Sequence, residues 1–397
     1  MAALQARWHQ AMAEIPAEAY TALLRQVTPV GAAPLPFYSW NWLHALEASG
    51  SIVPRQGWQP CHLGLWRGQT LVALAPLYVK GHSYGEFVFD QSFAQLASQL
   101  GLRYYPKLVG MSPLSPVEGY RFLIDANEDQ QALTDTLFQE MEAFCIRQRL
   151  LSCNLLYVDP SFAREARDRG WSLWLNEQSE WNNPGFADFD AYLASFNANQ
   201  RRNIRRERQA VAAAGLHVTP LSGEDIPPSL LGRMHDFYAQ HCSRWGVWGS
   251  KYLSAEFFTT AAQCLRSNLV LFSAHSDDPL SPVAMAFCVH NGQQLWGRYW
   301  GSDVEVDHLH FEVCYYAPLE WAIANGLRSF DPGAGGSHKK RRGFTAKPRL
   351  SAHQWFEPRF ASILQDWLPK ANAQMREEIE AINADLPFTA AYDPPSL

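Results

Sequence analysis

The expected order of helices and strands occurs twice along this chain, and this repetition restricts the fold more than any single motif. In the first half, the pattern predicts a hairpin over 62–79, a helix over 132–149 and a strand over 155–158. In the second half, it predicts strands over 269–274, 283–290 and 294–300, a helix over 311–325 and a strand over 328–331. We therefore predict an α/β (α+β) fold of two similar units, each a mixed sheet flanked by helices.

Length and composition fit a globular protein with two domains. The chain has 397 residues, of which 47% are hydrophobic and 18% charged, so extensive disorder is not expected. Its net charge of -6 argues against a protein that coats DNA. The seven cysteines are scattered without a CxxC pair, which predicts neither a disulfide framework nor a cysteine zinc site. No run approaches the roughly 18 apolar residues of a membrane span, so a cytoplasmic location is expected.

Domain boundaries are expected where the composition changes. Residues 1–33 are predicted to form an amphipathic helix over 1–25 followed by a linker, because charged side chains interrupt the apolar positions that a signal peptide would keep. The first domain is predicted over 34–178, the second over 179–368, and a C-terminal helix and tail over 369–397.

The stretch 296–344 concentrates side chains able to perform chemistry, and we expect the functional site there. It begins with WGRYWG, in which Arg298 and Trp300 would share one face of a strand and Tyr299 would lie on the other. An arginine buried in an aromatic strand needs a partner. Arg298 is therefore predicted either to form a structural ion pair or to bind a ligand.

Two histidines and a glutamate follow at the start of the predicted helix, in the sequence HLHFE. His310 or Glu312 is predicted to face a cleft as a base or as a group that orients one. Two other interpretations remain: His308, His310 and Glu312 could form part of a metal site, or they could simply cap and pack the helix end.

A glycine-rich basic loop closes the stretch, with the sequence DPGAGGSHKKRRGF. Gly333 and Gly336 would let the backbone approach a ligand closely. His338, Lys339 and Arg342 could neutralise an anion or a developing oxyanion. The alternative is a mobile surface loop.

The strongest basic cluster is NQRRNIRRER, predicted to lie on a helix. Guanidinium groups suit phosphate and carboxylate ligands. The cluster is therefore predicted to bind an anion, or alternatively to form a solvated face. The four arginines assigned to substrate binding are Arg201, Arg202, Arg205 and Arg206.

Taken in order, several segments resemble the FemAB-like peptidoglycan biosynthesis/recognition family, from about residue 34 to residue 368. The segments are PLPFYSWNWLHALEASG, APLYVKGHSYGEFVFD, LRYYPKL, RRNIRRER, KYLSAEFF, WGRYWG, LHFEVCYY, DPGAGGSHKKRRGF and SAHQWF. The resemblance implies two fused GNAT-like acyltransferase domains and an N-acyltransferase activity. It also implies an activated donor, either acyl-CoA or aminoacyl-tRNA, and an amine acceptor in peptidoglycan precursor metabolism.

The chain departs from that family in three places. Gly335 and Ser337 replace an amide and an acid in the family's glycine loop, and a histidine usual before the second half is replaced near Glu180. The acetyl-CoA pyrophosphate signature of GNAT enzymes is not visible. A non-catalytic protein that recognises a peptidoglycan precursor or an acylated ligand is therefore the alternative to an enzyme.

The predicted site follows from these observations. The residues predicted to be catalytic are His310, Glu312, His338 and Lys339, with no metal. Besides the four arginines, the residues predicted to bind substrate are Arg298, Tyr299, Trp300, Tyr315, Asp331, Gly333, Gly336 and Arg342.

Overall fold

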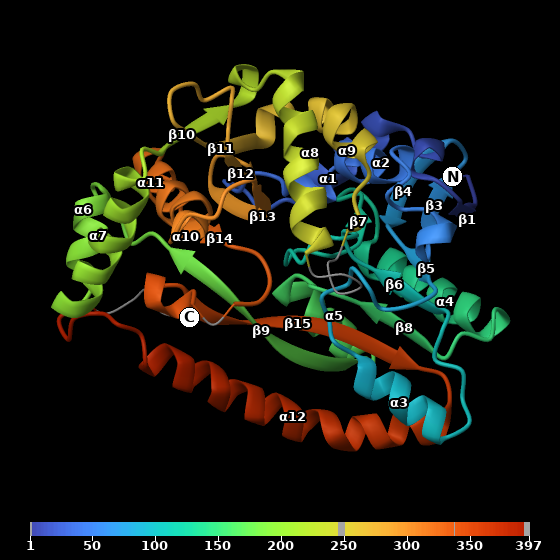
Figure 1. The fold of residues 1–397 in the computed structure, drawn as a ribbon. Helices are drawn as coiled ribbons and strands as arrows, with labels where there is room; N and C mark the ends of the chain where they lie inside the picture. Colours follow the sequence, from blue (N-terminus) through green and yellow to red (C-terminus); the bar gives the residue numbers. More distant parts are fainter. Residues whose placement is uncertain (1, 245–250, 337, 393–397) are drawn as a thin grey trace. The chain divides into compact units, whose positions relative to one another are not determined.

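The computed structural model describes residues 2–244, 251–336 and 338–392, and the chain separates into two compact units (Figure 1). Unit 1 comprises Met1–Asn176 and Arg349–Arg376, and unit 2 comprises Glu177–Pro348 and Glu377–Leu397. Three elements therefore contribute residues to both units. They are β9 (Ser172–Asn182), β15 (Thr345–Trp355) and α12 (Pro358–Ala384).

Unit 1 contains two sheets. Its strands are β1 (Leu4–His9), β2 (Trp58–Pro60), β3 (His62–Arg67), β4 (Thr70–Ala75), β5 (Tyr78–Lys80), β6 (Lys107–Gly110), β7 (Leu123–Ile124) and β8 (Ser152–Leu155). Its helices are α1 (Ala17–Val27), α2 (Trp40–Ala48), α3 (Gln91–Gln99), α4 (Gln130–Arg147) and α5 (Pro160–Asp168). One sheet is antiparallel, in the order β1-β3-β4-β7. The other runs β2-β5-β6-β8-β15, and its β6 and β8 are parallel.

The predicted N-terminal helix over 1–25 is wrong in its first part. Residues Leu4–His9 form β1, which pairs antiparallel with β3, and α1 begins only at Ala17, after Pro16. Trp8 stacks on Phe144 at 4.3 Å between ring centroids. The pairing with β3 and this contact outweigh the local helical pattern, because tertiary packing commonly overrides propensity.

The predicted hairpin over 62–79 is interrupted at Pro76. Strand β4 ends at Ala75 and pairs with β3, whereas β5 begins at Tyr78 and pairs with β2 and β6 in the other sheet. Proline cannot donate a ladder hydrogen bond, which disfavours one continuous strand through Pro76.

Unit 2 contains one large mixed sheet. Its strands are the second part of β9, β10 (His217–Ser222), β11 (Leu269–His275), β12 (Ala284–His290), β13 (Gln294–Ser302) and β14 (Ser329–Asp331). Its helices are α6 (Phe189–Ala194), α7 (Ala198–Ala213), α8 (Pro228–Ser243), α9 (Ala255–Thr259), α10 (Leu309–Phe311), the π-helical turn η7 (Glu312–Tyr316) and α11 (Ala317–Ala324). The strand order is β10-β11-β12-β13-β14-β9, and only the pairing of β13 with β14 is parallel.

Both units therefore contain a parallel strand pair joined by a helix. In unit 1, α4 lies between β6 and β8 along the chain; in unit 2, α10, η7 and α11 lie between β13 and β14. A parallel pair needs such a crossover connection. The prediction of two units with mixed sheets and flanking helices is confirmed.

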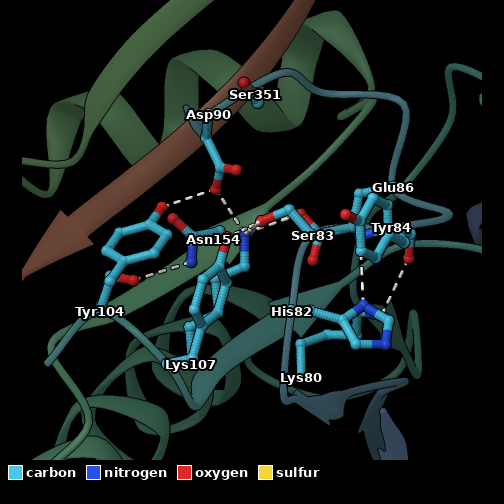
Figure 2. A network of polar contacts seen from close by, with 12 residues as sticks. Lys80, His82, Ser83, Tyr84, Glu86, Asp90, Tyr104, Lys107, Asn154 and Ser351 are labelled. Carbon is cyan, nitrogen blue, oxygen red and sulfur yellow. Dashed lines mark hydrogen bonds and ion pairs between the residues drawn. The ribbon is translucent and has the colours of Figure 1, made fainter. Parts of the chain in front are cut away.

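Unit 1 carries a buried network of charged side chains at the start of β6 (Figure 2). Lys107 Nζ lies 2.7 Å from Glu86 Oε2 and 2.5 Å from Asp90 Oδ2, and it donates to Ser83 Oγ at 2.9 Å. Tyr104 donates its hydroxyl hydrogen to the same oxygen of Asp90 at 2.6 Å. The Lys107 and Glu86 side chains are 1% and 0% exposed, so these ionic groups are held away from water.

The same network fixes the loop over 81–90. Lys80, the last residue of β5, donates to the backbone oxygen of Tyr84 at 3.1 Å, and its Nζ lies 3.6 Å from the centroid of the Trp58 ring. Burial lowers the pKa of Lys80 to about 7 and raises the pKa of Glu86 to about 7. The loop is thus anchored at both ends by groups whose charge is costly to bury without a partner.

We predict that Lys107→Met destabilises the chain by about 3–5 kcal/mol, because it leaves Glu86 and Asp90 buried without their shared cation. Lys370→Met, which changes an exposed lysine of α12, is the matched control and should change the free energy of unfolding by less than about 0.5 kcal/mol. Urea unfolding of both variants followed by circular dichroism measures the difference. Equal unfolding curves for the two variants would refute a structural role for the network.

Candidate functional site

A pocket of about 610 Å³ lies in unit 2 beside the parallel strands β13 and β14. We call it the β13 pocket. The residues that line it are His241, Ala286, Cys288, Gly297, Arg298, Tyr299, Trp300, His310, Cys314, Tyr315, Pro332, Gly333, Ala334, Gly335, Gly336 and His338. The pocket thus brings together much of the stretch that the sequence singled out.

The pocket exists because β14 ends while β13 continues. The two strands pair from Gln294 to Trp296 on β13, after which β14 gives way to Pro332 and the glycine loop. Gly333 has a φ of 89°, and a Cβ built there would lie 3.1 Å from the backbone oxygen of Gly297. Glycine is required at this position for both its backbone conformation and its close approach to β13.

Arg298 and Asp331 form a buried ion pair under the pocket. The Arg298 Nη2 to Asp331 Oδ2 distance is 2.9 Å, and the two side chains are 3% and 7% exposed. Asp331 also accepts a hydrogen bond from the backbone N–H of Gly333 at 2.8 Å. Of the two roles that the sequence left open for Arg298, the structure shows the ion pair, and it also places this arginine among the pocket-lining residues.

Three imidazole rings line the pocket, and two of them belong to a contact group with Tyr315. The Tyr315 hydroxyl lies 2.8 Å from His338 Nε2. The ring centroids of His310 and His338 are 5.6 Å apart, and the ring centroid of His310 lies 4.5 Å from that of Trp300. The side chains of His310, Tyr315 and His338 therefore converge on one wall of the pocket.

Both of these imidazoles are electrically neutral near pH 7. Burial, together with the neighbouring His338 and His241, lowers the pKa of His310 to about 3. Burial, Arg342 and Lys339 lower the pKa of His338 below 6.5. A neutral imidazole can accept a proton or hydrogen bond at one nitrogen while it donates at the other.

Lys339 lies behind the pocket and supports the glycine loop. Its ammonium group is buried and donates to the backbone oxygen of Gly333 at 2.5 Å. Burial lowers the pKa of Lys339 to about 8, although Asp331 opposes this shift. The side chain is not among those lining the pocket, and its visible contact is with the loop backbone.

Arg342 also lies behind the pocket. Its Nη2 is 2.7 Å from Glu207 Oε2, and its guanidinium carbon lies 3.4 Å from the centroid of the Phe311 ring. It donates to the backbone oxygen of His338 at 2.9 Å. With a side chain that is 2% exposed, Arg342 fixes the end of the glycine loop and does not line the pocket.

Glu312 faces a second depression of unit 2, of about 950 Å³, which we call the α7 groove. Arg208 binds the Glu312 carboxylate through Nε and Nη2, at distances between 2.9 and 3.1 Å. Burial raises the pKa of Glu312, although Arg208 opposes the shift. Of the two bases considered from the sequence, the structure therefore places His310 in the β13 pocket and Glu312 in the α7 groove.

The four arginines expected to bind an anion lie on α7, and none of them lines the β13 pocket. Arg201 donates to the backbone oxygen of Phe196, Arg202 is exposed, and Arg206 donates to Asn203. Arg205 is 60% exposed and lines the α7 groove. Arg208, on the same helix and 28% exposed, pairs with the buried carboxylate of Glu312.

One pocket residue and one ion-pair partner were not predicted from the sequence. His241 reaches the β13 pocket from α8, far along the chain from the stretch 296–344. Arg208 contacts Glu312 across 104 positions. Ser337, expected to alter the glycine loop, lies outside the described residues.

Two further findings concern ligands and membranes. Within the described part of the chain, no group of three or more His, Cys, Asp or Glu side chains is arranged to hold a metal ion. His308, which the sequence offered as a possible metal ligand, is the N-cap residue of α10 and adopts a φ of 67°. Over the same residues, no helix has both the length and the apolar character needed to cross a membrane.

The chain is similar to several solved structures, each at very low sequence identity. FemX is similar over 90% of this chain and 100% of its own, with 10% identity and a TM-score of 0.52. A tandem GNAT protein from the clavulanic acid biosynthesis pathway has 12% identity and a TM-score of 0.46 over 90% of this chain and 99% of its own. L-PGS from Bacillus licheniformis has 10% identity and a TM-score of 0.47 over 90% of this chain and 99% of its own.

No curated protein matches the sequence. The FemAB-like family, described as peptidoglycan biosynthesis/recognition, matches residues 11–390. This match covers nearly the whole chain and confirms the resemblance found in the sequence. The protein belongs to the FemAB-like family.

Proposed function

We propose that the protein transfers an acyl or aminoacyl group from an activated donor to an amine, and that the reaction takes place in the β13 pocket. Membership of the FemAB-like family supports a transferase of cell-envelope metabolism. The observation that carries the proposal is the contact between Tyr315 and the neutral His338 in a pocket that Arg298 also lines. Amide formation needs a proton acceptor near the amine and a positive group near the carbonyl oxygen.

His338 is proposed as the proton acceptor. As the amine nitrogen attacks the carbonyl carbon, an N–C bond forms and the nitrogen's proton passes to the imidazole. The bond from that carbon to the donor's sulfur or oxygen then breaks, and the leaving group departs with the electron pair and takes up a proton. The hydrogen bond to Tyr315 would hold the imidazole in one orientation, as a third group does in other acid–base sites.

His310 is proposed to act as a neutral wall of the site and not as its base. Its pKa of about 3 makes it a weak proton acceptor near neutral pH. Arg298 is proposed to stabilise negative charge on the carbonyl oxygen, because Asp331 fixes its guanidinium group in the lining of the pocket. Tyr299 and Trp300 would contact the apolar parts of the substrate.

The donor is proposed to be an acyl-CoA or an aminoacyl-tRNA, and the acceptor an amine of a peptidoglycan precursor. Arg202, Arg205 and Arg206 are exposed on α7 and remain candidates for contacts with the donor's phosphates. Such contacts would lie outside the β13 pocket, since none of these side chains lines it. A cytoplasmic location would give access to both kinds of donor.

We predict that full-length protein mixed with an amine-bearing peptidoglycan peptide forms an N-acylated product with one of three donors: acetyl-CoA, a long-chain acyl-CoA or an aminoacyl-tRNA. Mass spectrometry of the peptide identifies both the product and the transferred group. Saturable binding of a donor or peptide, without product from any donor, would instead favour a recognition protein.

His338→Gln is expected to lower kcat/KM by about 100- to 10,000-fold, because it removes the proton acceptor while keeping a polar side chain beside Tyr315. The matched control is His308→Asn. His308 does not line the pocket, and asparagine tolerates its positive φ. Product formation is followed by mass spectrometry with the active donor. Retention of full activity in His338→Gln would remove His338 from the mechanism.

The pH dependence of kcat/KM should show an acid limb below pH 6.5. His338 accepts a proton only when neutral, and burial and the neighbouring cations lower its pKa below 6.5. Activity is therefore expected to be retained above that pH and to be lost as the pH falls through the pKa of His338, after correction for the acceptor amine's own titration. A limb centred above pH 6.5 would contradict this assignment.

A further inference from the structure

We infer that Glu207 and Arg208, adjacent residues of α7, are positioning residues that hold the π-helical turn η7 and the end of the glycine loop in the geometry of the β13 pocket. Neither side chain lines that pocket. The inference rests on the proposed function in assigning the β13 pocket as the reaction site. The basic helix thereby acquires a role other than anion binding.

The two residues contact the two ends of the π-helical turn. Arg208 binds the carboxylate of Glu312, the first residue of η7, through a two-point contact with distances of 2.9 and 3.1 Å. Glu207 accepts a hydrogen bond from the hydroxyl of Tyr316, the last residue of η7. Consecutive residues of one helix therefore bracket the five residues of the turn.

A π-helical turn needs this kind of support. Helices with i→i+5 hydrogen bonds are rare, and they appear mostly as single turns, frequently at functional sites. In this protein the turn places Cys314 and Tyr315 on the β13 pocket and Glu312 on the α7 groove. Loss of the turn would rotate Tyr315 away from His338, because each residue of a helix sets the direction of those that follow it.

Glu207 also fixes the glycine loop from the same helix. Its Oε2 is 2.7 Å from Arg342 Nη2, and Arg342 in turn donates to the backbone oxygen of His338. A second connection from α7 is the hydrogen bond from Gln200 to the backbone oxygen of Arg341, at 2.7 Å. The helix thus holds both partners of the Tyr315–His338 contact through separate ionic contacts.

The Arg208 contact is reinforced on its other faces. Arg208 Nη2 lies 2.7 Å from Glu320 on α11, and its guanidinium carbon lies 4.5 Å from the centroid of the Phe189 ring. Bidentate arginine–carboxylate pairs are geometrically specific, so they set orientation as well as energy. A lysine at this position would keep the charge but lose that orientation.

The test uses three variants of the full chain: Arg208→Met, Glu312→Met and the double variant carrying both. Arg208→Met leaves the buried Glu312 carboxylate without its cation, whereas Glu312→Met leaves Arg208 with only Glu320, whose side chain is 51% exposed. The double variant replaces both partners of the Arg208–Glu312 pair by apolar side chains, and Glu320 can then turn to water. Arg167→Met is the matched control, because it makes the same substitution at an arginine of α5 that is 59% exposed and belongs to neither the β13 pocket nor the α7 groove.

The readout is the titration of His310 and His338, measured by NMR of histidine-labelled protein and assigned with His310→Gln and His338→Gln. It needs no donor or acceptor. In the wild type and in Arg167→Met, His310 should stay neutral to about pH 3. In the single and double variants, the pKa of His310 should rise by about one pH unit or more, and the pKa of His338 should also move toward 6.5, as the turn relaxes and water enters.

The thermal stability of the variants distinguishes a positioning role from the cost of burying an unpaired charge. We expect the midpoint of thermal unfolding to fall in each single variant and to recover in the double variant, while the histidine titrations stay shifted. Wild-type titrations in the single variants, or their return to wild-type values in the double variant, would overturn the inference. Should a single variant fail to fold, the double variant decides alone.

The same variants distinguish this inference from the proposed function. Shifted titrations in a protein that transfers no acyl group would support the positioning role and reject the transferase. Full turnover in the double variant would reject the positioning role and leave the transferase standing. If both hold, Arg208→Met should lower kcat with little change in KM. Arg208→Lys should restore only part of the wild-type kcat.

Discussion

Charged groups that are removed from water must find partners inside the protein, and this requirement shapes both units. In unit 1, Lys107 joins Glu86 and Asp90 and so fixes the loop over 81–90. In unit 2, Arg298 joins Asp331 where β14 ends. Removing one partner of such a pair costs far more than the pair itself contributes. Loops held this way have few alternative arrangements, and the walls of the β13 pocket depend on that restriction.

The same burial sets the electrostatic character of the pocket. Its cations lie behind or beneath the surface, and they lower the pKa values of the imidazoles that line it. A wall of neutral imidazoles next to a guanidinium group suits a reaction in which an amine loses a proton and a carbonyl oxygen gains negative charge. His338 combines a lowered pKa with an orienting contact to Tyr315, whereas His310 is more strongly shifted. Two histidines that look equivalent in the sequence thus suit different roles in the proposed reaction.

The sequence by itself determined the family, the two-unit α/β architecture and the region of the site. The repeated element order reflects periodicities of 2 and 3.6 residues that local burial imposes, so it is legible without a structure. His310, Tyr315, His338 and Arg298 were identified because they lie in a single stretch. Their convergence follows from a strand, a crossover helix and a parallel strand that are consecutive in the chain.

Only the tertiary structure decided which way the side chains of that stretch point and what they contact. The sequence could not decide whether His310 or Glu312 faces the cleft, and the Glu312 carboxylate meets Arg208 across 104 positions. Strand β1 likewise forms because a distant strand offers an edge. Helical spacing assumes 3.6 residues per turn, and a π-helical turn breaks that assumption and redirects the residues that follow. Ion-pair partners far apart in the chain leave no periodic trace, because their pairing depends on how the elements pack in three dimensions.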